Sequence, residues 1–193
     1  NAVDNLGIKV FTNCGVNEVY QQENQWVINT KEQRFIADQL VIAAGSSNKV
    51  WELCKTLNHA VIEPVPSLFT FNIKDERLTD LLGISVPNAT VELSGTNLSS
   101  SGPLLITHWG MSGPAILKLS AWGARILHDK NYQFAIEVNW LNDIETEEAE
   151  TLLKELKQEH AKKTVAKKSS FELQNRLWES LVLASGIGAE TKW

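Results

Sequence analysis

The sequence predicts an α+β fold: a small, mostly antiparallel β-barrel with packed helices and a C-terminal helical hairpin, preceded by a β-meander. Short runs of alternating apolar and polar residues recur along the chain, separated by polar turns. Apolar residues at helical spacing follow Pro114 and recur beyond residue 143. Pro64 and Pro66 stiffen a crossover, because each proline fixes its own φ and restricts its predecessor, and this places a domain border near residue 66.

Residues 1–45 read as short strands. Alternation predicts strands at 8–12, 16–20, 26–30 and 34–36, which together form an antiparallel meander. The run 40–44 is continuously apolar and ends at Gly45, a pattern typical of a strand buried on both faces of a parallel sheet. Because the meander alone would leave one edge of that strand unpaired, we expect residues 40–44 either to pair with another copy of the chain or to distort.

The region 67–140 supplies the strands of the barrel. They are expected at 67–73, 84–86, 89–95, 103–108 and 132–140, with a helical turn over 75–82 that Gly83 ends. A short helix is expected earlier, at 48–57, capped by Ser46, Ser47 or Asn48.

The segment 102–121 combines a strand, a glycine turn at Gly110 and Gly113, and a helix from Pro114 to about residue 128. The start of that helix would direct free N–H groups toward His108 and Trp109, where an anion or a carbonyl could bind. His108 is well placed as an acid–base group. The alternatives are that the glycines only shape the turn, and that His108 only hydrogen-bonds it.

The region 141–193 is predicted to be helical. Asp143 to Thr146 open one helix, with a stripe of leucines and His160 on one face. Ser169 or Ser170 would cap the last helix, over 171–185, which Gly186 ends. The lysines of the connector (Lys162, Lys163, Lys167 and Lys168) are interpreted as a solvated surface.

Composition excludes several classes of function. The chain has 193 residues, 43% of them hydrophobic, and a net charge of −5, so neither a basic nucleic-acid surface nor a membrane span is indicated. Cys14 and Cys54 lack metal-ligand spacing and fit packing residues of a reduced, cytoplasmic protein. No Walker loop, zinc motif, G-x-S-x-G or G-x-G-x-x-G is present, and no metal site is expected. The start at Asn1 indicates a fragment of a longer protein.

Two blocks resemble one known family. Residues 107–121, THWGMSGPAILKLSA, are similar to the TH-x-G-(L/M)-SGP-A-x-L signature of the YhiN-like flavoproteins, also called the aminoacetone oxidase family. Residues 37–71 resemble that family's A-D-x-V-(I/V)-L-A-T-G-G…LGH-x-I-x-P-x-P-S-L block, with Ser46 in place of the second glycine. The blocks occur in the family's order and cover most of the chain.

The resemblance implies a flavin-dependent oxidoreductase whose FAD carries the hydride chemistry while the protein orients the substrate. Residues 1–66 would then be a remnant of the FAD domain, with Ala44, Gly45 and Ser46 beside the cofactor. Residues 67–193 would be the substrate-side insert, with a barrel at 67–140 and a helical part at 141–193.

The substrate-side residues would be His108, Trp109, Gly110, Ser112 and Gly113. The remainder of the FAD domain and an unidentified small molecule would be the partners. This fragment alone is expected to lack FAD and to be inactive. The alternative is a non-catalytic interaction module, a small barrel with helices that binds a partner.

Overall fold

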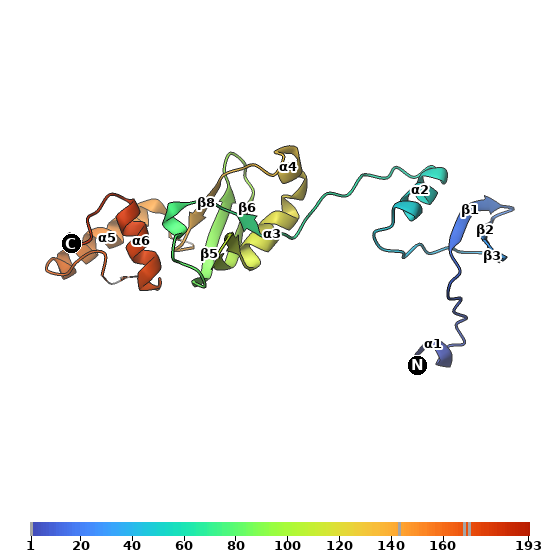
Figure 1. Ribbon diagram of the computed structural model, residues 1–193, viewed down its shortest axis with the longest axis horizontal. Coiled ribbons are helices and arrows are strands. Elements are labelled where there is room, and N and C mark those ends of the chain that lie inside the picture. The colour runs from blue at the N-terminus through green and yellow to red at the C-terminus, as the bar shows by residue number, and fades with distance from the viewer. Residues whose placement is uncertain (1, 143, 168, 170) are drawn as a thin grey trace. The chain divides into compact units, whose positions relative to one another are not determined.

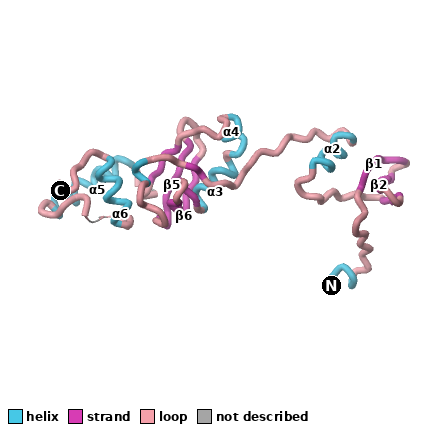
Figure 2. The backbone as a smooth tube through the Cα atoms, in the orientation of Figure 1, coloured by secondary structure: helices cyan, strands magenta, loops and turns pink. Residues whose placement is uncertain are grey.

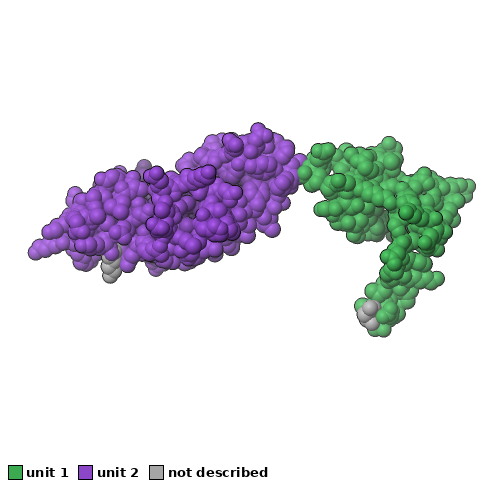
Figure 3. Space-filling model, viewed as in Figure 1, with its two compact units in different colours: residues 1–64 green, residues 65–193 purple. Residues whose placement is uncertain are grey.

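The computed structural model describes residues 2–142, 144–167, 169 and 171–193, and the chain divides into two compact units (Figure 3). The first unit comprises residues 1–64 and the second residues 65–193. Each unit is described by itself below. No helix in the described part of the chain is both long enough and apolar enough to cross a membrane.

The first unit contains the predicted meander. Strands β1 (Val16–Gln22), β2 (Gln25–Thr30) and β3 (Arg34–Ala37) pair antiparallel in the order β1-β2-β3. Glu23 and Asn24 form the two-residue turn between β1 and β2, and both have positive φ, as a type I′ hairpin turn requires. Helices α1 (Ala2–Asn5) and α2 (Asn48–Thr56) flank this sheet in sequence. The meander and the helix expected at 48–57 are thereby confirmed.

Two predicted strands of this unit are wrong. Residues 8–12 are irregular, and Ile8 and Val10 are exposed. Residues 40–44 also form no strand, and Val41 is 86% exposed. The apolar run at 40–44 fits a strand only if neighbours hydrogen-bond it and cover its faces, and no described strand pairs with it.

The second unit is built on a five-stranded antiparallel sheet in the order β4-β7-β6-β5-β8. Its strands β5, β6 and β8 are labelled in Figure 1. The strands are β4 (Phe71–Asn72), β5 (Ser85–Leu93), β6 (Ser99–Thr107), β7 (Gly110–Ser112) and β8 (Ile136–Asn139). A 3-10 turn, η1 (Glu76–Leu78), follows β4. The sheet curls into a half-barrel whose two edges, β4 and β8, do not pair with each other. The predicted α+β fold with a small barrel and helices is confirmed, and the sheet is open on one side.

Two helices cover this sheet where the sequence predicts one. They are α3 (Pro114–Trp122) and α4 (Ala124–Asp129), separated at Gly123. A side chain at Gly123 would place a Cβ 2.5 Å from the Leu98 side chain, so close packing requires glycine here. Ala115, Ile116 and Leu119 are fully buried on the inner side of α3, and the core continues through the inward residues of β5 and β6.

Helices α5 (Thr146–His160) and α6 (Asn175–Ala184) form the C-terminal part (Figure 2). Helix α6 starts four residues later than expected, and Asp143, Lys168 and Ser170 lie outside the described residues. Leu177 of α6 is buried in the main core, whereas Trp178 and Val182 join a second small cluster with Val165 and Ala166. The Trp178 Nε1–H donates to the Val165 carbonyl at 2.7 Å, and thereby ties the connector to α6.

Candidate functional site

The segment that carries most of the predicted site forms a hairpin. β6 ends at Thr107, His108 and Trp109 make the turn, and Gly110–Ser112 return as β7, with Ile106 opposite Met111. The predicted tight turn at Gly110 and Gly113 is therefore wrong, because the turn comes two residues earlier and residues 110–112 are a strand.

The two glycines are needed for close backbone approach. Gly110 has φ +150°, and a Cβ there would lie 2.5 Å from the Ile73 nitrogen of the β4 segment. Gly113 has φ +99°, and a Cβ there would lie 2.7 Å from the Pro103 carbonyl oxygen. These glycines hold β4 against β7, and α3 against β6, and neither lines the groove described below.

The start of α3 lies outside the groove. Pro114 takes the first helical position, as predicted, and Gly113 occupies the N-cap position. However, β7 separates the turn at His108 and Trp109 from the helix start, and Ala115 and Ile116 are fully buried. No residue of α3 lines the groove. Ser112 also lies outside it.

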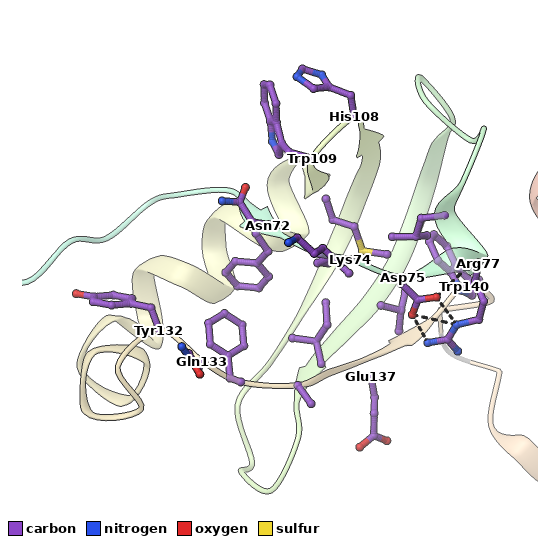
Figure 4. Close-up of a pocket in the computed structure, with 18 of the residues that line it drawn as sticks. Asn72, Lys74, Asp75, Arg77, His108, Trp109, Tyr132, Gln133, Glu137 and Trp140 are labelled. Carbon is purple, nitrogen blue, oxygen red and sulfur yellow. Dashed lines mark hydrogen bonds and ion pairs between the residues drawn. The ribbon is translucent and has the colours of Figure 1, made fainter.

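A groove of about 1290 Å³ runs along the open side of the half-barrel, between the edge strands β4 and β8 (Figure 4). Residues of three segments, 71–78, 108–111 and 132–140, line it together with Leu181. Its volume is above the range of about 300–1,000 Å³ that is usual for small-molecule sites. The unpaired sheet edges thus leave a space in which a ligand of several rings fits.

Aromatic rings form one wall of this groove. The ring centroids of Phe71 and Phe134 lie 4.9 Å apart in an edge-to-face arrangement, which joins β4 to the segment before β8. Phe69 does not line the groove but packs against two rings that do, with its ring centroid 6.0 Å from that of Phe71 and 5.9 Å from that of Tyr132. Such contacts fix ring orientation, so this wall is a preformed apolar surface.

His108 and Trp109 stand together at one rim of the groove (Figure 4). Their ring centroids are 3.9 Å apart, with an angle of 68° between the planes. Trp109 is 46% exposed, and no carboxylate in the described part of the chain pairs with His108. The structure therefore offers an exposed indole and an accessible imidazole, and the acid–base role of His108 stays a prediction.

Charged groups gather at the far end of the groove. Asp75 accepts hydrogen bonds from Nε and Nη2 of Arg77 and from its backbone N–H. The side-chain hydrogen bonds from Arg77 lower the pKa of the Asp75 carboxyl group, and the same bonds raise the pKa of Arg77. Lys74 precedes this pair and forms no ion pair among the described residues. It is the groove's free cation in that part of the chain.

The predicted cofactor residues lie in the first unit. Ala44, Gly45 and Ser46 form an exposed loop, with Gly45 at φ +62°, directly before α2. The N-cap of α2, Ser47, makes no side-chain hydrogen bond. Such a loop offers a dinucleotide a contact at one helix start. Neither the loop nor the rest of the sequence contains the glycine fingerprint that holds a pyrophosphate.

Sequence reasoning missed most of the groove. Lys74, Tyr132, Phe134 and Trp140 line it, and none of them is among the site residues that the sequence predicts. Alternation in the segment 132–140 predicts that some of these side chains face inward. It does not predict that β4 and β8 are the sheet edges, which is what makes that inner face accessible.

A curled antiparallel half-barrel with packed helices and a groove on its open side defines a barrel-and-helix domain. Residues 65–193 match the family described as "HI0933-like protein barrel and H2TH domain", and the chain belongs to this family. This confirms the family resemblance in the sequence.

Two curated relatives give the family context. The chain is 29% identical to "Ribosomal RNA dihydrouridine synthase" of Haemophilus influenzae over 131 residues, which are 61% of this chain and 32% of the relative. It is 23% identical to "3-dehydro-bile acid delta(4,6)-reductase" of Clostridium scindens over 148 residues, which are 72% of this chain and 36% of the relative. The chain thus spans about a third of the length of these relatives.

Proposed function

We propose that the chain is part of a flavin-dependent oxidoreductase and that residues 65–193 form its substrate-side domain. The observation that carries this proposal is the groove on the open side of the half-barrel, in the unit that matches the family. The names of both relatives support an oxidoreductase, since one forms dihydrouridine in ribosomal RNA and the other reduces a dehydro-bile acid.

The chemistry in those names suggests a reaction type. Dihydrouridine is uridine with two hydrogens added across the ring double bond that is conjugated to a carbonyl group. A 3-dehydro-bile acid with ring double bonds at positions 4 and 6 contains the same conjugated carbonyl arrangement. We infer that the longer protein reduces a carbon–carbon double bond conjugated to a ring carbonyl group. The reduction adds a hydride and a proton to that bond.

Within this chain, the groove would bind the ring and His108 would supply the proton. Histidine is the side chain that most often transfers protons in enzymes, and His108 is exposed at the rim of the groove. FAD would be held by parts of the longer protein outside this chain, because the Ala44–Ser46 loop does not amount to a dinucleotide site.

The test uses the longer protein that contains this chain, purified and assayed without oxygen with a nicotinamide reductant. Uridine-containing ribosomal RNA and a 3-dehydro-bile acid are the two substrates, and mass spectrometry detects the gain of two hydrogens. We expect reduction of one of them. His108→Gln should lower kcat by about a hundredfold, the lower end for a lost general acid. His128→Gln, outside the groove, is the control.

The interaction-module alternative predicts the opposite outcome. A protein that only binds a partner would contain no reducible flavin and would reduce neither substrate, and His108→Gln would then change no rate. Absence of bound flavin in the longer protein would refute the proposed function.

A further inference from the structure

We propose that the groove between β4 and β8 binds a flat ring that carries an anionic group, with the ring against Trp109 and the anion paired with Lys74. The inference rests on the proposed function, since it names the substrate class for the same site. It comes from three properties of the groove: its aromatic lining, its free cation and its size.

The aromatic lining favours a flat, unsaturated ring. Trp109 is 46% exposed at the rim, although an indole of this size usually gains from burial. His108 packs edge-on to it and leaves a face of the indole accessible, and Figure 4 shows both rings standing above the groove. Further inside, Phe71 and Phe134 offer an apolar floor. A planar ring gains from stacking on such surfaces whatever its substituents.

The charges of the groove favour one anion. Arg77 is occupied by Asp75 through its hydrogen bonds, so these two charges neutralise each other. Lys74 has no such partner in the described part of the chain, and it lies centrally among the groove side chains in Figure 4. Glu137 is also at the groove, but in Figure 4 its side chain points away from the other labelled side chains. The free charge facing a ligand is therefore positive.

The size of the groove admits two sources of this chemistry. A volume of about 1290 Å³ exceeds what one ring needs, so it suits a ring with an extended anionic arm. A uridine nucleotide, free or within RNA, has a flat ring and a phosphate. A bile acid of the dehydro type has a conjugated ring system and a carboxylate.

The test is calorimetric titration of the 193-residue chain without flavin. The probes are uridine 5′-monophosphate with uridine as its uncharged match, and a 3-dehydro-bile acid with its methyl ester as the second matched pair. We expect one charged probe to bind at least about threefold more tightly than its uncharged match, the size expected for an exposed ion pair. Added salt should reduce that preference. Which pair binds identifies the source.

Two variants and two controls locate the site. Lys74→Gln should remove the preference for the charged probe, and Trp109→Ala should weaken both members of the pair at least about fivefold, as loss of ring stacking does. Lys118→Gln and Trp122→Ala, both outside the groove, should change neither the preference for the charged probe nor the affinity for either member of the pair. Thermal unfolding checks that each variant is folded, and Trp109→Phe, which keeps a ring, should restore most of the affinity.

Binding of neither charged probe, or equal effects of the groove variants and their controls, would overturn this inference. Because no flavin or reductant is present, such a result leaves the reductase assay of the longer protein to decide the proposed function separately. Conversely, if the longer protein shows no reductase activity, the affinity measured for this groove still stands as evidence for the inference.

Discussion

Gly110→Ala should separate β4 from the sheet and dismantle one wall of the groove. At this position φ is +150°, and a Cβ would collide with the backbone of the β4 segment, at the Phe71 carbonyl and 2.5 Å from the Ile73 nitrogen. Ile73 N–H donates to the Trp109 carbonyl at 2.8 Å, and that bond would be lost. A backbone forced into a glycine-only region costs about 1–3 kcal/mol, and the lost hydrogen bond adds about 1 kcal/mol.

We therefore expect Gly110→Ala to lower the free energy of unfolding of the second unit by about 2–4 kcal/mol. The assay is urea unfolding followed by tryptophan fluorescence, which reports mainly on this unit because it contains Trp109, Trp122, Trp140, Trp178 and Trp193. Gly95→Ala is the matched control, since its φ is +75° but nothing lies within 4 Å of the added Cβ. Equal loss of stability in the two variants would refute the reasoning, because the collision with β4 and the φ of +150° occur at Gly110 and not at Gly95.

Three further predictions concern charge, cofactor and association. Arg77 lowers the pKa of Asp75 from 3.8, so their interaction stabilises the fold above that pH and is lost as pH falls through the lowered value. Asp75→Asn should thus destabilise the chain at pH 7, and a difference that persists undiminished at about pH 2 would contradict this. The chain purified alone should be colourless, and FAD titration giving a stoichiometric yellow complex would show that a pyrophosphate site exists in it. The apolar segment 40–44, with Val41 86% exposed, should promote self-association that Val41→Lys reduces in light scattering, and a monomeric unmodified chain would disprove this.

Local sequence patterns predict those helices and strands that are determined by residues close together in the sequence. Alternation and a polar turn suffice for the hairpin of β1 and β2, and proline after Gly113 suffices to start α3. The close packing at Gly123 cannot be predicted this way, because it involves Leu98, which lies 25 positions earlier in the printed sequence. The run 40–44 has a strand's composition, yet composition does not provide neighbouring strands.

The same distinction applies to the candidate site, because only some of its residues can be predicted from local sequence. His108 and Trp109 stand out in the sequence because they follow a strand and precede glycines, and the structure places both at the groove. Lys74 and Phe134 carry no such signal. Their importance depends on β4 and β8 being the two edges of one curled sheet, and sheet order is set by pairing between residues far apart in the sequence.

The indole N–H signals in a proton–nitrogen correlation spectrum test the central claim most directly. Seven tryptophans give seven signals, which Trp→Phe variants assign, and Trp109 and Trp140 line the groove. Titration with the bound probe, uridine 5′-monophosphate or the 3-dehydro-bile acid, should shift these two signals saturably and leave those of Trp26, Trp51 and Trp122 in place. Largest shifts at Trp26, Trp51 or Trp122, or no shift at Trp109, would contradict a substrate-binding role for the open side of the half-barrel.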